Sequence, residues 1–188
     1  MPDSLGLESG EVRVVPYDRA WPELYAAEIA RLETILLPRG VSLVFEHTGS
    51  TAVPGLAAKP VLDILAAPRV EAKRAPIIAA LQAAGYSYRD EQGVAGRDFF
   101  RRGVPRQYHI HLTSLNSAFW RDHLTFRDYL RSHPDAAADY AALKLELAAK
   151  YPRDREAYID GKAPFVDAIL VAAIRPGLET PGAPLPYD

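Results

Sequence analysis

Residues 46–65, EHTGSTAVPGLAAKPVLDIL, are the part of this 188-residue sequence that decides the fold. They read as the end of a strand, a turn at Gly49 and Ser50, and a second, apolar strand that carries Asp63. Glycine lets a backbone approach an anion closely, and the hydroxyls of Ser50 and Thr51 add donors. No Lys-Ser/Thr pair follows the glycines, so this is not a P-loop. The stretch predicts a phosphate-binding turn; a plain tight turn is the alternative.

Hydrophobic periodicity outside this stretch predicts a mixed sheet with helices packed on it. The predicted strands are 11–15, 41–46, 61–66, 86–90, 97–102 and 107–113. The predicted helices are 21–36, 72–84, 117–132, 135–150 and 155–173, the last interrupted by Gly161 and Pro164. We therefore expect an α/β (α+β) fold in four segments: a loose N-terminus (1–10), the α/β core (11–115), a helical part packed on the core (116–174) and a proline-rich tail (175–188).

Composition narrows the classes of function. The chain has no cysteine, which excludes disulfides, thiolate metal sites and a cysteine nucleophile. Lys+Arg 22 against Asp+Glu 24 gives a net charge of −2, which offers no support for binding nucleic acid or a membrane surface. The sequence has neither a long apolar run nor the pattern of a secretory signal, so we expect a cytoplasmic protein.

Three polar residues interrupt predicted apolar strands. Asp63 lies in VLDILA, and an ionised carboxylate is rarely buried without a partner or a metal ion. His109 and His111 lie in YHIHL, and residues i and i+2 of a strand share one face, about 6.6 Å apart along the strand. Two imidazoles on one face can ligate a metal ion, bind phosphate or act as acid and base. The alternative is one satisfied core histidine and one at a sheet edge.

Several cations are candidates for phosphate binding. Lys59 follows the glycine turn, and Arg97 and Arg101 share one face of a predicted strand, where they could clamp a triphosphate. For each of them a solvated surface is the alternative. Further cations lie on the predicted C-terminal helices: Arg127, Arg131, Lys144 and Lys162. Arg127 and Arg131, four residues apart on one helical face, could close a ligand site, and helix salt bridges are the alternative.

The runs VVPYDRAWPELY, HTGSTAVPGLAAKPVLDIL, YHIHL and FRDYLRSHPDAAADYAALKLELA resemble the GrpB family, and the resemblance covers residues 12–174. It implies a nucleotidyltransferase-like core, in which a Gly-Ser loop cradles a triphosphate and carboxylates in an Asp-x-Asp/Glu strand hold a divalent metal ion. Some members of the family are fused to dephospho-CoA kinase, which hints at nucleotide or coenzyme chemistry.

The sequence fits this pattern in part. Gly49 and Ser50 match the loop and Asp63 matches the first carboxylate, but Leu65 occupies the position of the second. Two-metal transfer needs several oxygen ligands, so the site is either rebuilt around Asp63, His109 and His111 or has lost catalysis. Imidazole suits zinc or manganese better than magnesium, and the resemblance and the ligand set together leave Mg²⁺, Mn²⁺ and Zn²⁺ open.

Two hypotheses of function follow. The first is metal-assisted nucleotidyl or phosphoryl transfer, with Asp63 and His47 catalytic, Asp63, His109 and His111 binding the metal ion, and a nucleotide or other phosphorylated small molecule as substrate. Phosphate would be bound by the turn and its neighbouring cations: Gly49, Ser50, Thr51, Lys59, Arg97 and Arg101. The alternative is a non-catalytic module that binds the same ligands. Metal-dependent hydrolysis of a phosphoester is a weaker third hypothesis.

Overall fold

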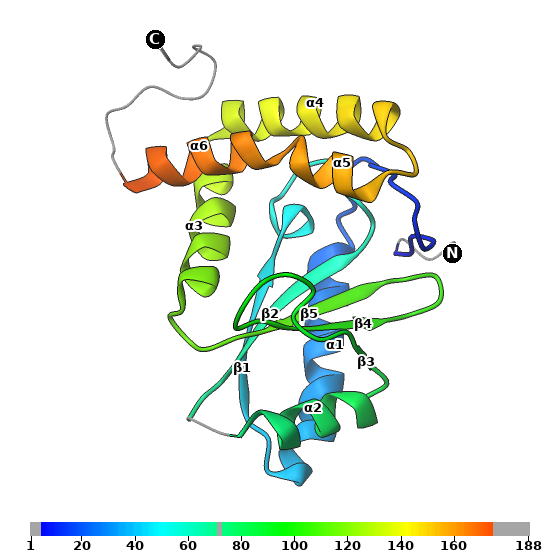
Figure 1. Ribbon diagram of the computed structural model, residues 1–188, viewed down its shortest axis with the longest axis vertical. Coiled ribbons are helices and arrows are strands. Elements are labelled where there is room, and N and C mark those ends of the chain that lie inside the picture. The colour runs from blue at the N-terminus through cyan, green and yellow to red at the C-terminus, as the bar shows by residue number, and fades with distance from the viewer. Residues whose placement is uncertain (1–4, 71–72, 175–188) are drawn as a thin grey trace.

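The computed structural model describes residues 5–70 and 73–174. A five-stranded mixed sheet lies at its centre, in the order β1-β2-β5-β4-β3 (Figure 1). Only β2 and β5 are parallel, and the other neighbouring pairs are antiparallel. The strands are β1 (Leu43–Thr48), β2 (Leu62–Pro68), β3 (Ser87–Tyr88), β4 (Asp98–Arg102) and β5 (Tyr108–Leu112). The predicted α/β fold is confirmed.

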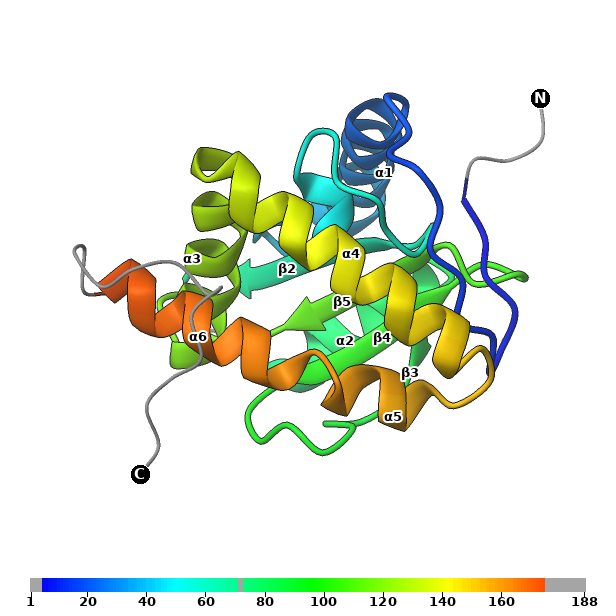
Figure 2. The same cartoon turned by 90° about the horizontal axis from the view of Figure 1, so that it is seen from above.

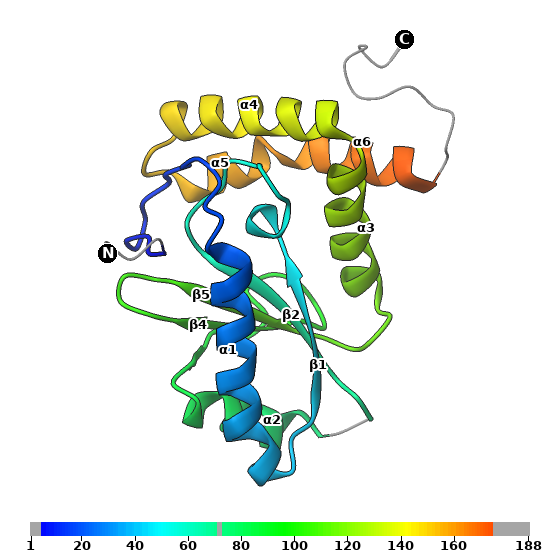
Figure 3. The same ribbon diagram turned by 180° about the vertical axis from the view of Figure 1, so that it is seen from behind.

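One face of the sheet is covered by α1 (Trp21–Leu36) and α2 (Arg74–Ala83), as the view from behind shows (Figure 3). The helix α1 has the predicted bounds, because its apolar residues recur at helical spacing and Pro22 is tolerated in the first turn. The side chains of alternate strand residues, including Leu62, Ile64 and Ile110, enter the main core here. This layer fixes which strand residues point to the opposite face.

The opposite face and one end of the sheet are covered by the C-terminal helices (Figures 1 and 2). They are α3 (Ala118–Ser132), α4 (Pro134–Lys150), α5 (Arg155–Asp160) and α6 (Ala163–Ile174). Ser117 caps α3 by accepting a hydrogen bond of 3.1 Å from the amide of Trp120. The helix expected over 155–173 is interrupted at Gly161 as predicted, where a Cβ would lie 2.6 Å from Leu147 of α4. The interruption predicted at Pro164 is wrong, because Pro164 lies in the first turn of α6, where proline is tolerated.

Two short 3₁₀ turns complete the described elements, η1 (Leu37–Arg39) after α1 and η2 (Ser50–Ala52) between β1 and β2. The turn η2 occupies the segment in which the sequence predicted a phosphate-binding turn. The apolar residues that follow it, Val53 and Leu56, pack against α3, α4 and α6. The C-terminal helices therefore hold η2 against the end of the sheet.

Near the N-terminus the structure differs from the predictions. The predicted strand over 11–15 is wrong: this segment pairs only through one isolated bridge, Val15 to Ala58, while Val12 packs against α4 and α5. Residues 5–10, expected to be loose, contribute Leu5 and Leu7 to the buried interior. Residues 1–4 and the predicted tail 175–188 lie outside the described part. No helix within 5–70 and 73–174 has the length and apolar character needed to cross a membrane.

Candidate functional site

A cavity of about 400 Å³ opens where β1 ends, between the sheet and the C-terminal helices. Its lining includes the end of β1 and η2 (Thr48–Thr51), Asp63 of β2 and His111 of β5. The helices add aromatic, apolar and basic side chains: His123 and Phe126 from α3, Tyr140 and Lys144 from α4, Tyr158 from α5, and Val166 and Leu170 from α6. Lys59 and Lys162 also line it. The predicted core and the predicted helical part thus build this site together.

Asp63, His109 and His111 form a compact cluster on the face of the sheet that carries the cavity. Register explains it, because Asp63 of β2 lies beside His109 of β5 and His111 follows on the same face. His109 Nδ1 lies 2.9 Å and His111 Nε2 lies 3.3 Å from the same oxygen, Asp63 Oδ1. Burial raises the pKa of the Asp63 carboxyl, but the hydrogen bonds from the two imidazoles outweigh it and hold the pKa well below its usual value.

The donor atoms of this cluster fit a divalent metal ion. One carboxylate oxygen and two imidazole nitrogens lie within 4.8 Å of one another. Ligands about 2.1 Å from a metal ion and 90–110° apart are themselves about 3.0–3.4 Å apart, close to the separations of 2.9 and 3.3 Å observed here. Two imidazoles with one carboxylate suit manganese or zinc better than magnesium.

Gly49 explains why the turn after β1 can lie so close to this cluster. Its φ is +71°, a conformation that residues with a side chain rarely adopt. A Cβ at this position would lie 2.8 Å from Asp63 Oδ2. The glycine therefore allows the backbone before η2 to lie directly against the carboxylate. Ser50 and Thr51 also line the cavity, and the Thr51 hydroxyl lies 3.0 Å from His47 Nε2.

Three lysines line the same cavity: Lys59 before β2, Lys144 on α4 and Lys162 between α5 and α6. Within the described residues none of them forms an ion pair with a carboxylate, although Lys144 Nζ donates to the Ala57 carbonyl. Lys59 Nζ and Lys162 Nζ both lie near the ring of Tyr158, at 5.0 and 4.7 Å from its centroid. The three ammonium groups converge on one space.

The electrostatics of the lysines reflect this crowding. Burial, followed by repulsion from Lys162, lowers the pKa of Lys59 to about 7. Burial, followed by repulsion from Lys162 and Lys59, lowers the pKa of Lys144 to about 7, and burial lowers that of Lys162 to about 8. A buried cation without an acidic partner is costly. A bound anion would offset that cost and raise all three pKa values.

Leu65 is fully buried and packs with Val44, Ala67 and Trp120 between the sheet and α3. It lies on the same face as Asp63, at the position where the resemblance led us to look for a second carboxylate. The apolar contacts explain why that position carries leucine, since an unpaired carboxylate there would lose its hydration without a partner.

Successive side chains of β1 point to opposite faces of the sheet, and His47 points away from the Asp63 cluster. It pairs with Ile64, so its ring enters the α1 side of the sheet, where it stacks on Tyr25 at 4.6 Å between centroids. Burial lowers the pKa of His47 to about 4. The structure therefore does not bring His47 together with Asp63 at the cavity; Thr48, the next residue, lines it instead.

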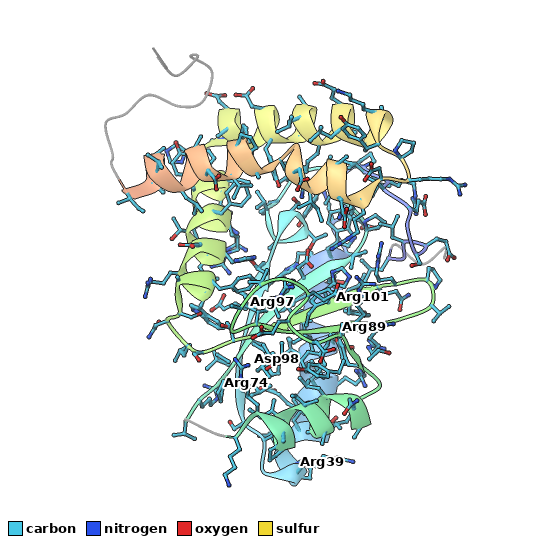
Figure 4. All side chains as sticks on the ribbon, viewed as in Figure 1. Arg39, Arg74, Arg89, Arg97, Asp98 and Arg101 are labelled. Carbon is cyan, nitrogen blue, oxygen red and sulfur yellow. The ribbon has the colours of Figure 1, made fainter. Side chains whose placement is uncertain are left out.

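Two arginines of α3 act as braces. Arg127 donates to Glu46 at 2.8 Å and to the His47 carbonyl at 2.9 Å, and Arg131 donates to the Ala52 carbonyl at 2.8 Å. They tie α3 to β1 and to η2, which fixes the turn beside the cavity. Neither of them lines the cavity. Arg97 and Arg101 also lie outside this cavity, on the neighbouring part of the sheet face (Figure 4).

A family model described as GrpB protein matches residues 11–172. The chain belongs to the GrpB family. Among other GrpB-like proteins, a UPF0157 protein of Pseudomonas aeruginosa is 42% identical over 172 residues, covering 89% of this chain and 69% of that protein. The crystal structure of the conserved protein GrpB from Enterococcus faecalis matches with a TM-score of 0.76 and 35% identity, covering 86% of this chain and 97% of that chain.

Two further matches are to a longer protein and to a structure of low sequence identity. A protein named dephospho-CoA kinase, from Mycolicibacterium paratuberculosis, is 31% identical over 180 residues, which cover 82% of this chain and 44% of that protein. The GrpB-like region is thus less than half of that relative. A structure of the Cid1 poly(U) polymerase matches with a TM-score of 0.49 and 14% identity, a likeness too low for any inference about function.

His123 is a site residue that the sequence analysis missed. It lines the cavity, its ring lies 6.0 Å from that of His111, and its Nδ1 lies 2.8 Å from the Phe119 carbonyl oxygen. That contact fits a proton on Nδ1 and leaves Nε2 as an acceptor. Burial lowers the pKa of His123 to about 4. The signal available in the sequence was its position four residues after Phe119, which puts both side chains on one face of the predicted helix.

Proposed function

We propose that the cavity binds the phosphates of a nucleotide or coenzyme-related molecule, and that Asp63, His109 and His111 hold a divalent metal ion beside them. The protein would then transfer a nucleotidyl or phosphoryl group. The observation that carries the proposal is the convergence of three lysines, none of them ion-paired with a carboxylate in the described part of the chain, on a cavity lined by a carboxylate–imidazole cluster. Family membership is consistent with it.

The lysines support a polyphosphate as the ligand. Three half-buried or buried ammonium groups that repel one another need several negative charges in one compact molecule to offset them. A triphosphate provides oxygens on successive phosphorus atoms, so that each lysine can bind a different group. The apolar and aromatic lining, with Phe126, Val166 and Leu170, suits the rest of an organic ligand.

The metal ion, when bound, would polarise a phosphoryl oxygen as a Lewis acid. The residues of this chain would hold the metal ion and bind the phosphates. Asp63, His109 and His111 supply its ligands, and the glycine at position 49 keeps the carboxylate accessible to the turn. Lys59, Lys144 and Lys162 bind and orient phosphate, and they would also stabilise charge on the leaving phosphate.

Binding without catalysis is the second candidate function. Leu65 favours it, because its packing against Trp120 removes the second carboxylate from the strand that carries Asp63. A site with one carboxylate and two imidazoles holds one metal ion more readily than two. Under this alternative the same cavity captures the nucleotide and the metal ion, but no product forms.

A thermal-shift screen tests the shared part of both candidates. Nucleoside triphosphates, coenzyme A precursors and inorganic phosphates are each added with Mg²⁺, Mn²⁺, Zn²⁺ or a chelator. A ligand at a hundred times its Kd adds about 2.7 kcal/mol, or about 5–10 °C for a chain of this size. We expect a metal-dependent shift with a triphosphate in the wild type.

The variants decide what the shift means. Asp63→Asn should remove the dependence on metal, and Lys162→Met should remove the shift itself. Lys150→Met is the matched control, since Lys150 is an exposed lysine of α4 away from the cavity. Equal shifts in Lys162→Met and in the control would contradict the proposal. Product analysis by mass spectrometry with the ligand that gives the shift then separates transfer from binding alone.

A further inference from the structure

A second cavity, of about 390 Å³, adjoins the first at the Asp63 cluster. The two cavities share six lining residues: Lys59, Val61, Asp63, His111, His123 and Lys162. Its remaining lining differs, because Arg97 and Arg155 take the place of the turn after β1, accompanied by Gln92, Val94, Phe99, His109 and Ile159. Asp63 and His111 therefore line two adjoining cavities. Of the cations, Lys144 lines only the first, Arg97 and Arg155 line only the second, and Lys59 and Lys162 line both.

Arg97 lies just before β4 and Arg101 within it, and both are labelled in the side-chain view (Figure 4). Their guanidinium groups lie 5.0 and 5.2 Å from the centre of the same ring, Phe99. In the β4–β5 ladder Phe99 is opposite His111, and Arg101 is opposite His109. The two arginines thus flank an aromatic residue directly beside the histidines.

These arginines belong to a group of four, with Arg106 and Arg155, that lacks acidic partners. Across residues 5–70 and 73–174 none of the four forms an ion pair. The Nε atoms of Arg97, Arg101 and Arg106 are buried and have no hydrogen-bond partner among those residues. Burial, followed by repulsion from Arg106 and Arg155, lowers the pKa of Arg101 to about 10.

Other half-buried arginines of the fold differ from these four because they pair with carboxylates. Arg31 and Arg102 both bind the buried carboxylate of Glu28, and Arg127 binds Glu46 and Asp128. A half-buried guanidinium normally has its donors satisfied. Arg97 donates through Nη2 to the Glu91 and Gln92 carbonyls, but its Nε and those of Arg101 and Arg106 remain unpartnered among the described residues. Together with the lack of a carboxylate partner for any of the four, this points to a ligand that supplies acceptor oxygens.

We propose that Arg97 and Arg155, which line this second cavity, form a second anion-binding site with Arg101 beside them on the Phe99 ring, and that this site takes a small molecule that carries a phosphate group. Guanidinium groups match phosphate oxygens in a bidentate geometry. A cavity of about 390 Å³ is large enough for a small molecule, and Val94, Phe99 and Ile159 offer apolar contacts to the rest of it. Arg97 and Arg155 do not line the first cavity, so their part in anion binding is tested apart from it, whereas the role of this site as the acceptor site rests on the proposed function.

As acceptor, such a molecule fits the groups that are present. An ionised phosphate oxygen forms the new bond to phosphorus with its own electron pair. The bond from phosphorus to the leaving phosphate breaks, and that leaving group keeps the electron pair of the broken bond. No proton has to be removed from the acceptor, so the step needs no general base, in keeping with the position of His47 on the other face of the sheet.

Titration calorimetry with inorganic pyrophosphate counts the sites. We expect two pyrophosphate ions per chain for the wild type, one for the Arg97→Gln/Arg155→Gln double variant, and one for each of the lysine variants Lys144→Met and Lys144→Gln, since Lys144 lines only the first cavity. The control is Arg39→Gln/Arg153→Gln, which removes the same charge from exposed positions, and it should keep two. Circular dichroism checks each fold, and Arg101→Gln serves as a second variant that should weaken the same binding event at least tenfold.

The outcomes separate this proposal from the previous one. Two ions bound by the arginine double variant, or a single ion that only the lysine variants lose, would overturn the second site. A loss in the arginine variant with no loss in the lysine variants would overturn the proposed function and leave the second site standing. Loss of single-stranded oligonucleotide binding in the arginine variant, with pyrophosphate binding unchanged, would assign the arginines to nucleic acid and also overturn it.

Discussion

Replacement of Lys144 by methionine should flatten the dependence of stability on pH. Lys144 is 2% exposed, and burial together with repulsion from Lys162 and Lys59 lowers its pKa to about 7. Below pH 7 the lysine is charged in both states, and the folded state carries the full cost of the buried charge. Between pH 7 and the ordinary pKa of 10.5 the unfolded chain holds a proton that the folded chain has lost. Stability from this group therefore rises with pH in that window.

The size of the effect follows from the same pKa. Each proton bound only by the unfolded state changes the free energy of unfolding by about 1.4 kcal/mol per pH unit. Because Lys144 is half ionised at pH 7 and neutral at pH 9 in the folded state, its contribution over this interval is about 2 kcal/mol. Methionine has similar length and no charge, so it removes this contribution. It also removes the repulsion between Lys144 and its neighbours Lys162 and Lys59, which acts in the same direction.

Urea unfolding at pH 7 and pH 9 measures this. The wild type should gain about 2 kcal/mol more than Lys144→Met between the two values, and the exposed-site control Lys150→Met should follow the wild type. The substitution also leaves the Ala57 carbonyl without its donor. That cost is the same at both pH values, so it cancels when the change in the free energy of unfolding between pH 7 and pH 9 is compared. An equal gain in the wild type and Lys144→Met would refute the reasoning that Lys144 is a strained buried cation.

Three further substitutions test other parts of the site. Gly49→Ala should weaken Mn²⁺ binding at least tenfold in equilibrium dialysis, because its Cβ would lie 2.8 Å from Asp63 Oδ2; wild-type affinity would count against this. Leu65→Asp should lose about 3 kcal/mol in urea unfolding at pH 7, since it buries an unpaired carboxylate against Trp120; unchanged stability would contradict that packing. Arg127→Met should lose about 2–3 kcal/mol, because it leaves Glu46 and the His47 carbonyl without their donor; a loss equal to that of the exposed Arg121→Met would refute the brace.

The sequence predicted well those features that depend on local periodicity. Helix α1 has the expected bounds, and the spacing of His109 and His111 on one strand face is what brings both to Asp63. Glycine at position 49 signalled a close approach, and the structure gives its reason in the Asp63 carboxylate. These inferences need only the repeat of a strand or helix and the size of a side chain.

Features that depend on tertiary packing were out of reach. His47 and Thr48 are neighbours on β1, and nothing local says which of them faces the cavity, because both faces of the sheet are covered. The predicted strand over 11–15 failed for a similar reason: alternation alone cannot supply a partner strand. The cavity lysines Lys144 and Lys162 become site residues only because the C-terminal helices fold over the end of the sheet (Figure 2).

The central claim is that a divalent metal ion and a polyphosphate bind side by side in one cavity. Coupling between the two ligands tests it most directly, because coupling free energies are reciprocal. Electron paramagnetic resonance of Mn²⁺ should report tighter metal binding when a nucleoside triphosphate is present with the wild-type protein. The gain should disappear in Asp63→Asn and in Lys162→Met but persist in Lys150→Met. Mn²⁺ binding that is the same in the wild type and Asp63→Asn, with or without the triphosphate, would contradict the account.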